Sequence, residues 1–320
     1  MSERSRTQDI LVDILGVQNT INGYLNSINT ALGEGGALSG LDGINTPFRH
    51  GDRVIYVDCS APGPTHDGTT KDTAWLTIQD GLDDAATTNN TDLILIFADP
   101  GGDGYDINGN DEDSTWSHND VIIVGIGRDQ VRIINTFEGA DHILGFESSH
   151  VYIKNLTFWT GSEDVERVYL KLNTHCDGSE IYNCDFYTLN AHKGTIGVFL
   201  EAERCRIERC HFYIQDDEED PVNRTYGVVL YGANRNEIID CIFDGAHPSV
   251  PGGIGIFAED NSRQNVFKNN VFIENAIAID LDQTTVNNFS VRSNYAGCIE
   301  DFGDDSGENY EVCPCTTAVI

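Results

Sequence analysis

The sequence is poor in basic residues, with 19 Lys and Arg against 52 Asp and Glu, a formal net charge of −33. A field of this sign repels nucleic acid and anionic membranes, so neither is an expected partner. No run of about 18 apolar residues is present, and the polar start Met1–Arg6 lacks the apolar core of a signal peptide. We therefore expect a chain that is made in the cytoplasm and inserts into no membrane.

Methionine occurs once, and the nine cysteines are odd in number, a pattern that does not indicate a disulfide framework. Turn-forming residues are abundant instead, with 32 glycines and many Asn and Asp. This composition predicts a turn-rich, repetitive β architecture with corners recurring along the chain. At 320 residues and 39% hydrophobic content, the chain can bury a substantial core.

A stripe of apolar residues spaced by three or four positions occupies the N-terminal part of the chain. From Ile21 onward the stripe follows a heptad, and Gln18 forms a single polar core layer. The pattern predicts a coiled coil, with a trimer as the expected state. A helix packed on its own domain is the alternative, because Val17 and Tyr24 widen the stripe. The expected trimerisation residues are Leu11, Ile14, Gln18, Ile21, Leu25, Ile28 and Leu32.

Six segments from residue 150 onward repeat one pattern. Each has an apolar residue, then Cys, Leu or Asn three positions later, then usually Phe after two more, and a second apolar strand such as Val198–Leu200 lies between segments. Two strands per turn at this irregular period predict an all-β, right-handed parallel β-helix. The segments are Ile153/Leu156/Phe158, Ile181/Cys184/Phe186, Ile207/Cys210/Phe212, Ile238/Cys241/Phe243, Phe267/Asn270/Phe272 and Val291/Asn294/Ala296.

Stacked rungs about 4.8 Å apart place like residues in columns along the helix axis. Cys184, Cys210 and Cys241 are expected to form a column of reduced packing residues, because parallel side-chain vectors do not suit a disulfide and zinc needs converging ligands. Asn270 and Asn294 are expected to form an amide column at a corner.

The domain organisation that we expect has five parts. Residues 1–33 form the helix, and residues 34–53 form a glycine-rich linker. Residues 54–120 form the N-terminal capping part, 121–297 the parallel β-helix, and 298–320 a C-terminal cap or tail.

The opening of the β region resembles that of pectin-lyase-like parallel β-helix proteins. The resemblance is carried by Ile55–Asp58, Asp67–Thr70 and Thr73–Gln79. Within residues 73–85, Trp75, Ile78, Leu82 and Ala85 recur at helical spacing and predict a short helix. The resemblance implies that a strand and such a helix cap the N-terminal end of the coil. The superfamily includes lyases, hydrolases and non-catalytic viral proteins, so it implies a fold more than an activity.

A coiled coil directly before such a β-helix, with no signal peptide, resembles the trimeric tail spikes, tail fibres and capsid decoration proteins of bacteriophages. The resemblance implies a structural protein of the virion surface that attaches to the host. The alternatives are a capsid decoration (cement) protein and a depolymerase, a polysaccharide lyase or glycoside hydrolase acting on host surface glycan. Expected partners are two further copies of the chain, other virion proteins and host surface polysaccharide.

Candidate catalytic residues are few. Of the tripeptides that mark polygalacturonases, Gly-His-Gly and Arg-Ile-Lys are absent, and Asn90-Thr91-Asp92 is interpreted as a turn entering the Leu93 strand. Carboxylates that could converge on one face lie in two loops, and no spacing separates Arg204, Arg206 and Arg209 from ordinary surface arginines. We therefore favour a non-enzymatic role. The weak catalytic candidates are Asp164, Glu166, Asp216 and Asp217.

A calcium site is the one cofactor alternative, and otherwise no cofactor is expected. Asp106, Asn108 and Asn110 place oxygen ligands at alternate positions, but Asp111 stands where a calcium loop needs Gly and Ser117 where it needs Glu. The segment is better interpreted as a turn-rich loop.

Three aromatic residues are candidates for sugar stacking. Trp116, Trp159 and Tyr187 offer flat faces of the kind that pyranose rings pack against, and packing against a neighbouring subunit is the alternative role.

The predicted coiled coil can be tested directly. We expect Ile21→Asp or Ile28→Asp to weaken the trimer, because each places a charge in the apolar seam. Sedimentation of the two variants beside the unmodified chain measures the effect. An unmodified chain that sediments as a stable monomer would contradict the prediction.

Overall fold

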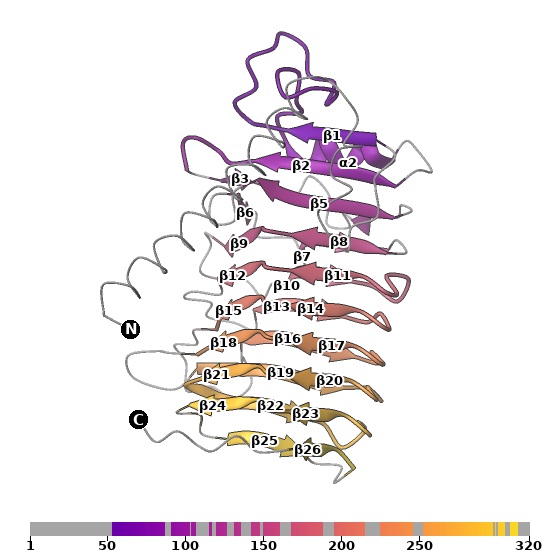
Figure 1. Cartoon of the computed structure of the whole chain (residues 1–320), viewed down its shortest axis with the longest axis vertical. Coiled ribbons are helices and arrows are strands. Elements are labelled where there is room, and N and C mark those ends of the chain that lie inside the picture. The colour runs from indigo at the N-terminus through magenta and orange to yellow at the C-terminus, as the bar shows by residue number, and fades with distance from the viewer. Residues whose placement is uncertain are drawn as a thin grey trace, which may run out of the picture. The chain divides into compact units, whose positions relative to one another are not determined.

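A computed structural model (Figure 1) gives the fold. The described residues are 53–86, 91–102, 104–106, 115–116, 120–126, 131–135, 142–147, 150–160, 168–187, 195–214, 225–245, 252–296, 298, 300–304 and 308–312. The predicted helix of residues 1–33 and all its trimerisation residues lie outside this set. Among the described residues, no helix is long and apolar enough to span a bilayer.

Three parallel sheets, here called A, B and C, form the walls of a coil (Figure 1). Sheet A has ten strands among the described residues, stacked in chain order. They are β1 (Arg53–Val57), β2 (Asp92–Phe97), β5 (Val121–Ile126), β8 (Val151–Lys154), β11 (Glu180–Tyr182), β14 (Arg206–Glu208), β17 (Glu237–Ile239), β20 (Val266–Lys268), β23 (Phe289–Val291) and β26 (Tyr310–Val312).

Sheets B and C each have eight strands among the described residues. Sheet B contains β3 (Tyr105–Asp106), β6 (Arg132–Asn135), β9 (Thr157–Thr160), β12 (Asp185–Tyr187), β15 (His211–Tyr213), β18 (Ile242–Asp244), β21 (Val271–Ile273) and β24 (Asn294–Ala296). Sheet C contains β4 (Thr115–Trp116), β7 (His142–Phe146), β10 (Val168–Leu172), β13 (Ile196–Leu200), β16 (Tyr226–Tyr231), β19 (Gly252–Glu259), β22 (Asn275–Leu281) and β25 (Glu300–Asp304).

The parallel β-helix is confirmed, but each turn has three strands where the sequence predicted two. A repeat segment is in fact two strands joined by a tight corner, as Ile181 lies in β11 and Phe186 in β12. Only Asn183 and Cys184 separate these strands, and Asn183 makes the bend with a φ of 56°. A corner this short leaves the apolar alternation almost unbroken, so the two strands look like one in the sequence.

The last repeat is shifted by one residue from the predicted register. Phe267 pairs with Ser290, and Phe272 with Tyr295. The inward residues are therefore Ser290, Ser293 and Tyr295, and the predicted Val291/Asn294/Ala296 set lies outside the core. Because side chains alternate between the two faces, a slip of one residue moves the whole set to the other face.

The capping helix is confirmed but begins later than predicted. Helix α2 (Ile78–Ala86) starts after Thr77, whose hydroxyl accepts a hydrogen bond from the Asp80 backbone N–H at 3.1 Å. Trp75 lies before the helix and pairs with Val57 as an isolated parallel bridge. The apolar side of α2 is buried among the first rungs of sheet A, through Ile78, Leu82 and Ala85.

Stacked aromatic rings line the inner side of sheet B and fill the core there. Phe158, Phe186, Phe212, Phe243 and Phe272 lie one per rung with centroids 4.8–4.9 Å apart, and Tyr295 continues the stack at 5.4 Å. Where sheet C faces these rings, its inward column consists of small residues, which leave space for the aromatic side chains. A Cβ on Gly227, for example, would lie 2.7 Å from the Phe243 ring. The core is thus set by columns that run along the axis.

The strand pairing of the coil continues into its first and its last rungs. Strands β1, β2 and β5 are neighbours in sheet A, so the segment expected as a cap already belongs to the coil. At the other end β25 pairs with β22, and β26 with β23, beyond residue 297.

The aromatic core column gives a stability test. We expect Phe243→Ala to lower the free energy of unfolding by about 3–5 kcal/mol, because it removes a fully buried ring between two stacked neighbours. The control is Ile242→Ala on the same strand, which points outward and should cost about 0.5 kcal/mol or less. Urea unfolding of both variants measures the difference. Equal losses would contradict the assignment of inward and outward sides.

Candidate functional site

Outward-facing aromatic residues form a column on sheet B. Along β9, β12 and β15 the inward phenylalanines are each followed by a residue that points to the outer surface. These residues are Trp159, Tyr187 and Tyr213, which the strand register places directly above one another. Sheet B therefore carries one aromatic side chain per rung over three rungs.

Only part of this aromatic surface is open to a ligand. The rings of Tyr187 and Tyr213 are stacked with centroids 4.1 Å apart and planes 9° apart, so they cover each other's faces. The Trp159 side chain is 37% exposed, with the Arg132 guanidinium 5.3 Å from the ring centroid. The column thus offers an indole surface at one end and tyrosine edges and hydroxyls below it.

Polar groups border the column. Asp185 and His211 occupy the neighbouring outward column, and Asp244 lies on the rung below Tyr213 in the aromatic column. The His211 ring is 3.7 Å from the Tyr213 ring, centroid to centroid. We call Arg132, Trp159, Asp185, Tyr187, His211, Tyr213 and Asp244 the aromatic face.

The electrostatics keep the Tyr213 hydroxyl protonated. Burial raises the pKa of Tyr213 far above its ordinary value, and a hydrogen bond with Tyr187 and the charges of Asp185 and Asp244 raise it further. The phenol is therefore neutral at physiological pH and retains its proton as a hydrogen-bond donor. Together with the carboxylates and the indole, it provides the mixture of donors, acceptors and apolar surface that suits a polyhydroxylated ligand.

The structure brings together some of the predicted site residues. Trp159 and Tyr187 lie on adjacent rungs of one face, and sequence reasoning missed their neighbour Tyr213. A signal for it exists, since Tyr213 follows Phe212 as Tyr187 follows Phe186. For Trp116 and Asp106 the structure describes only the backbone, in β4 and β3. Asp164, Glu166, Asp216, Asp217, Asn108 and Asn110 lie outside the described residues.

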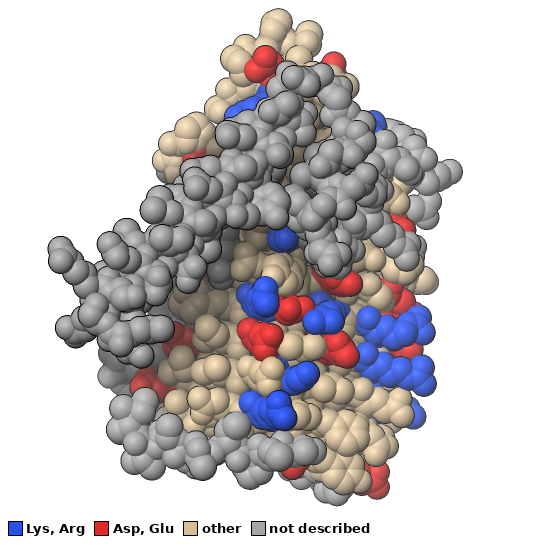
Figure 2. Space-filling model, viewed as in Figure 1, with Lys and Arg blue, Asp and Glu red and all other residues tan. Residues whose placement is uncertain are grey.

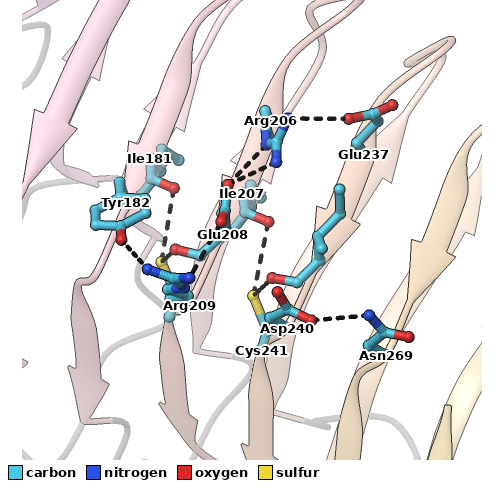
Figure 3. A network of polar contacts seen from close by, with 12 residues as sticks. Ile181, Tyr182, Arg206, Ile207, Glu208, Arg209, Glu237, Asp240, Cys241 and Asn269 are labelled. Atoms are coloured by element: carbon cyan, nitrogen blue, oxygen red, sulfur yellow. Dashed lines mark hydrogen bonds and ion pairs between the residues drawn. The ribbon is translucent and has the colours of Figure 1, made fainter. Parts of the chain in front are cut away.

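The three arginines singled out in the sequence lie on sheet A and at its edges. Arg204 pairs with Asp177 at 2.8 Å, and Arg206 with Glu208 at 2.7 Å. Arg209 is 3.7 Å from Glu208 and donates a hydrogen bond to the Tyr182 hydroxyl (Figure 3).

Figure 2 shows basic and acidic groups interleaved on this side of the coil. The three arginine side chains are 44–58% exposed, and ion pairs of surface arginines contribute little to stability. The interpretation of the three residues as ordinary surface arginines agrees with this network.

Asp92 of the Asn90-Thr91-Asp92 tripeptide contributes to the fold, and Asn90 lies outside the described residues. Strand β2 begins at Asp92, one residue before the predicted Leu93 strand, and the Asp92 side chain is almost fully buried. Its carboxylate pairs with Arg53 at 3.0 Å, and Arg53 also pairs with Asp84 of α2 at 2.8 Å. These contacts join the capping helix to the first two strands of sheet A.

The cysteine column is buried. Cys184, Cys210 and Cys241 are at most 1% exposed and are not in disulfides. Burial raises the pKa of Cys184 and of Cys210 well above the ordinary thiol range. Among the described residues, no group of three His, Cys, Asp or Glu is arranged to hold a metal ion.

The amide column differs from the prediction. Asn270 is buried, accepts from the Cys241 N–H at 2.9 Å and donates to the Ile238 carbonyl at 2.9 Å, but Asn294 is exposed. A longer amide column lies at the turns that lead from sheet C to sheet A. It consists of Asn236, Asn265, Asn288 and Asn309.

Comparison with known proteins supports the fold. The family model for the right handed beta helix region matches residues 141–312. No curated protein matches.

Several solved structures are similar. A rhamnogalacturonan lyase is 12% identical to this chain. The alignment covers 77% of this chain and 74% of the lyase, with a TM-score of 0.50. The pectin methylesterase from Aspergillus niger is 15% identical over 83% of this chain and 92% of its own, with a TM-score of 0.45. ORF18 of Geobacillus virus E2 is 13% identical to this chain. The alignment covers 79% of this chain and 58% of the viral protein, with a TM-score of 0.31. At these identities the likeness concerns the fold alone.

The buried thiols lead to a labelling test. At pH 8 we expect iodoacetamide to leave Cys184, Cys210 and Cys241 unmodified in the native protein, because all three thiols are buried and burial raises the pKa of Cys184 and Cys210. The exposed Cys59 serves as the internal reference, and all four should react after unfolding in urea. Peptide mass spectrometry measures the labelling. Native modification of the column at the rate of Cys59 would contradict the assignment.

Proposed function

Because the chain belongs to the right-handed β-helix family, a rigid fold that presents long flat faces, we propose that it is a virion surface protein that binds host surface glycan through the aromatic face. The observation that carries the binding site is the exposed Trp159 in register with Tyr187 and Tyr213, bordered by Asp185 and Asp244. The virion part of the proposal is supported by the predicted coiled coil ahead of the β-helix, which is typical of tail spikes and fibres.

The proposed ligand is a neutral glycan. A net charge of −33 repels acidic polysaccharides, and the two carboxylates on the aromatic face add to that repulsion locally. Sugar hydroxyls can donate to Asp244, and the neutral Tyr213 phenol can donate to a sugar oxygen. Asp185 is buried and contributes its charge to the face. The Trp159 indole supplies the apolar surface that a pyranose ring covers.

Binding fits this face better than hydrolysis does. A glycosidase needs two carboxyl groups about 5 to 9.5 Å apart. The register places Asp185 and Asp244 two rungs apart, which is about 10 Å along the axis before their offset along the strand is added. Depolymerase activity stays an alternative for the carboxylates of the loops, Asp164 and Glu166.

The aromatic face can be tested by mutation. We expect Trp159→Ala to weaken binding of purified host surface glycan about tenfold, which corresponds to about 1.4 kcal/mol of lost stacking. Tyr213→Phe should weaken binding less, since it removes only a hydroxyl. Isothermal titration calorimetry measures both. The matched control is Ile273→Ala, which lies in the same outward column two rungs beyond Tyr213 and should bind as the unmodified chain does.

Two outcomes would contradict the proposal. The first is unchanged glycan affinity in Trp159→Ala. The second is release of reducing ends from host glycan that Asp164→Asn or Glu166→Gln abolishes, which would favour the depolymerase. Immunogold labelling of purified virions separates attachment from decoration, with signal expected at the tail and not over the capsid.

A further inference from the structure

One inward column runs through all ten described strands of sheet A. The column is apolar from β1 to β20 and changes at the last two strands, β23 and β26. In order along the axis its residues are Ile55, Ile94, Ile123, Ile153, Ile181, Ile207, Ile238, Phe267, Ser290 and Glu311. A carboxylate therefore occupies the position at which eight other rungs carry an apolar side chain.

Glu311 lies where the coil ends. We call strands β24, β25 and β26 the coil end (Figure 1), because none of the described strands follows them in its sheet. Glu311 is exposed, and the neighbouring Tyr310 is 49% exposed. Ser290, which precedes Glu311 in the column, is only 1% exposed. Water thus reaches the last position of the column but not the one before it.

Polar groups of the last two rungs gather beside Glu311. The Ser290 hydroxyl is 3.2 Å from the Ser293 hydroxyl and 2.9 Å from the Tyr295 hydroxyl. Burial raises the pKa of Tyr295 far above its ordinary value, and the nearby charge of Glu311 raises it further. The carboxylate is therefore close to the phenol, on the inward side of sheet A, as the strand register requires.

The opposite end of the coil is closed by apolar contacts. Helix α2 covers it, with Ile78 and Leu82 at most 2% exposed. A Cβ on Gly81 would lie 2.6 Å from the Val57 side chain, so the helix packs directly on the first inward residues. The described residues contain no second helix that could cover the coil end in the same way.

A last rung that no helix covers is a place where further strands can add. Strand edges of this kind pair readily with another chain, and a second copy offers a matching end, because it has the same three sheets at the same rung spacing. The N-terminal end of that copy is closed by α2. The end that is left for pairing is therefore its own coil end.

We propose that Glu311 keeps the coil end of this chain from joining the coil end of a second copy. A two-fold axis normal to sheet A would place β26 of one copy beside β26 of the other. The two inward columns would then meet, with one Glu311 facing the other. Both carboxylates would lose water and repel each other inside a continuous core, which opposes the association. An inward-pointing charge is one of the means by which natural sheets protect their edges.

Variants of Glu311 test the proposal by their mass. In sedimentation equilibrium at micromolar concentration we expect Glu311→Val to have about twice the mass of the unmodified chain, because it continues the apolar column to the end. Glu311→Gln, which removes the charge and keeps the size of the side chain, should associate more weakly. Glu311→Lys should keep the mass of the unmodified chain, because a charge of either sign opposes burial.

The matched control is Glu308→Val. It removes the same charge from an exposed residue just before β26, outside the inward column, and should leave the mass unchanged. Urea unfolding of each variant verifies that it is folded, and valine suits an inward position of a strand.

Hydrogen exchange locates the new contact. We expect backbone amides on the free side of β24, β25 and β26 to exchange about tenfold more slowly in Glu311→Val than in the unmodified chain, since they gain partners there. Peptides from β1 and β2, at the opposite end, are the internal reference and should not change.

Three outcomes would overturn the proposal. They are Glu311→Val and Glu311→Gln with the mass of the unmodified chain, a doubled mass without slower exchange at the coil end, and a doubled mass in Glu308→Val or Glu311→Lys as well. Glycan binding through the aromatic face should be unaffected by these variants, so this proposal and the proposed function fail separately.

Discussion

Hydrogen bonding between successive rungs is the interaction on which the other features depend. At the turns into sheet A, buried asparagine amides repeat the backbone pairing: Asn265 accepts from the Asn236 N–H at 2.9 Å and donates to the Ala233 carbonyl at 2.9 Å. The same exchange recurs at Asn288 and Asn309. Because buried amides are costly to leave unsatisfied, these bonds hold each rung in register with the next. The residue columns of core and surface follow from that register.

The sequence predicted the fold correctly wherever the inward-facing residues are apolar. The three inward positions of the first five predicted repeats are all buried, and three of these repeats have Ile, Cys and Phe at recognisable spacings. The last rung was misread because Val291 and Ala296 look more like core residues than Ser290 and Ser293 do. Burial of the serines is stabilised by their own contacts, with the Ser290 hydroxyl 3.2 Å from Ser293 and 2.9 Å from the Tyr295 hydroxyl. A hydropathy pattern contains no such pairing.

The surface could be predicted much less well. Trp159 and Tyr187 were recognisable as single aromatic residues, but their alignment with Tyr213 depends on a register that varying loop lengths hide in the sequence. The candidate carboxylates Asp164, Glu166, Asp216 and Asp217 lie in loops outside the repeat pattern, so no repeat predicts where they lie relative to one another.

One coil thus presents outer faces of different chemistry: ion pairs on sheet A, and aromatic rings with carboxylates on sheet B. Because the same inward columns support both faces, the outward residues of one sheet can differ without disturbing those of the other. A ligand-binding face can therefore be built on sheet B while the ion pairs of sheet A stay unchanged.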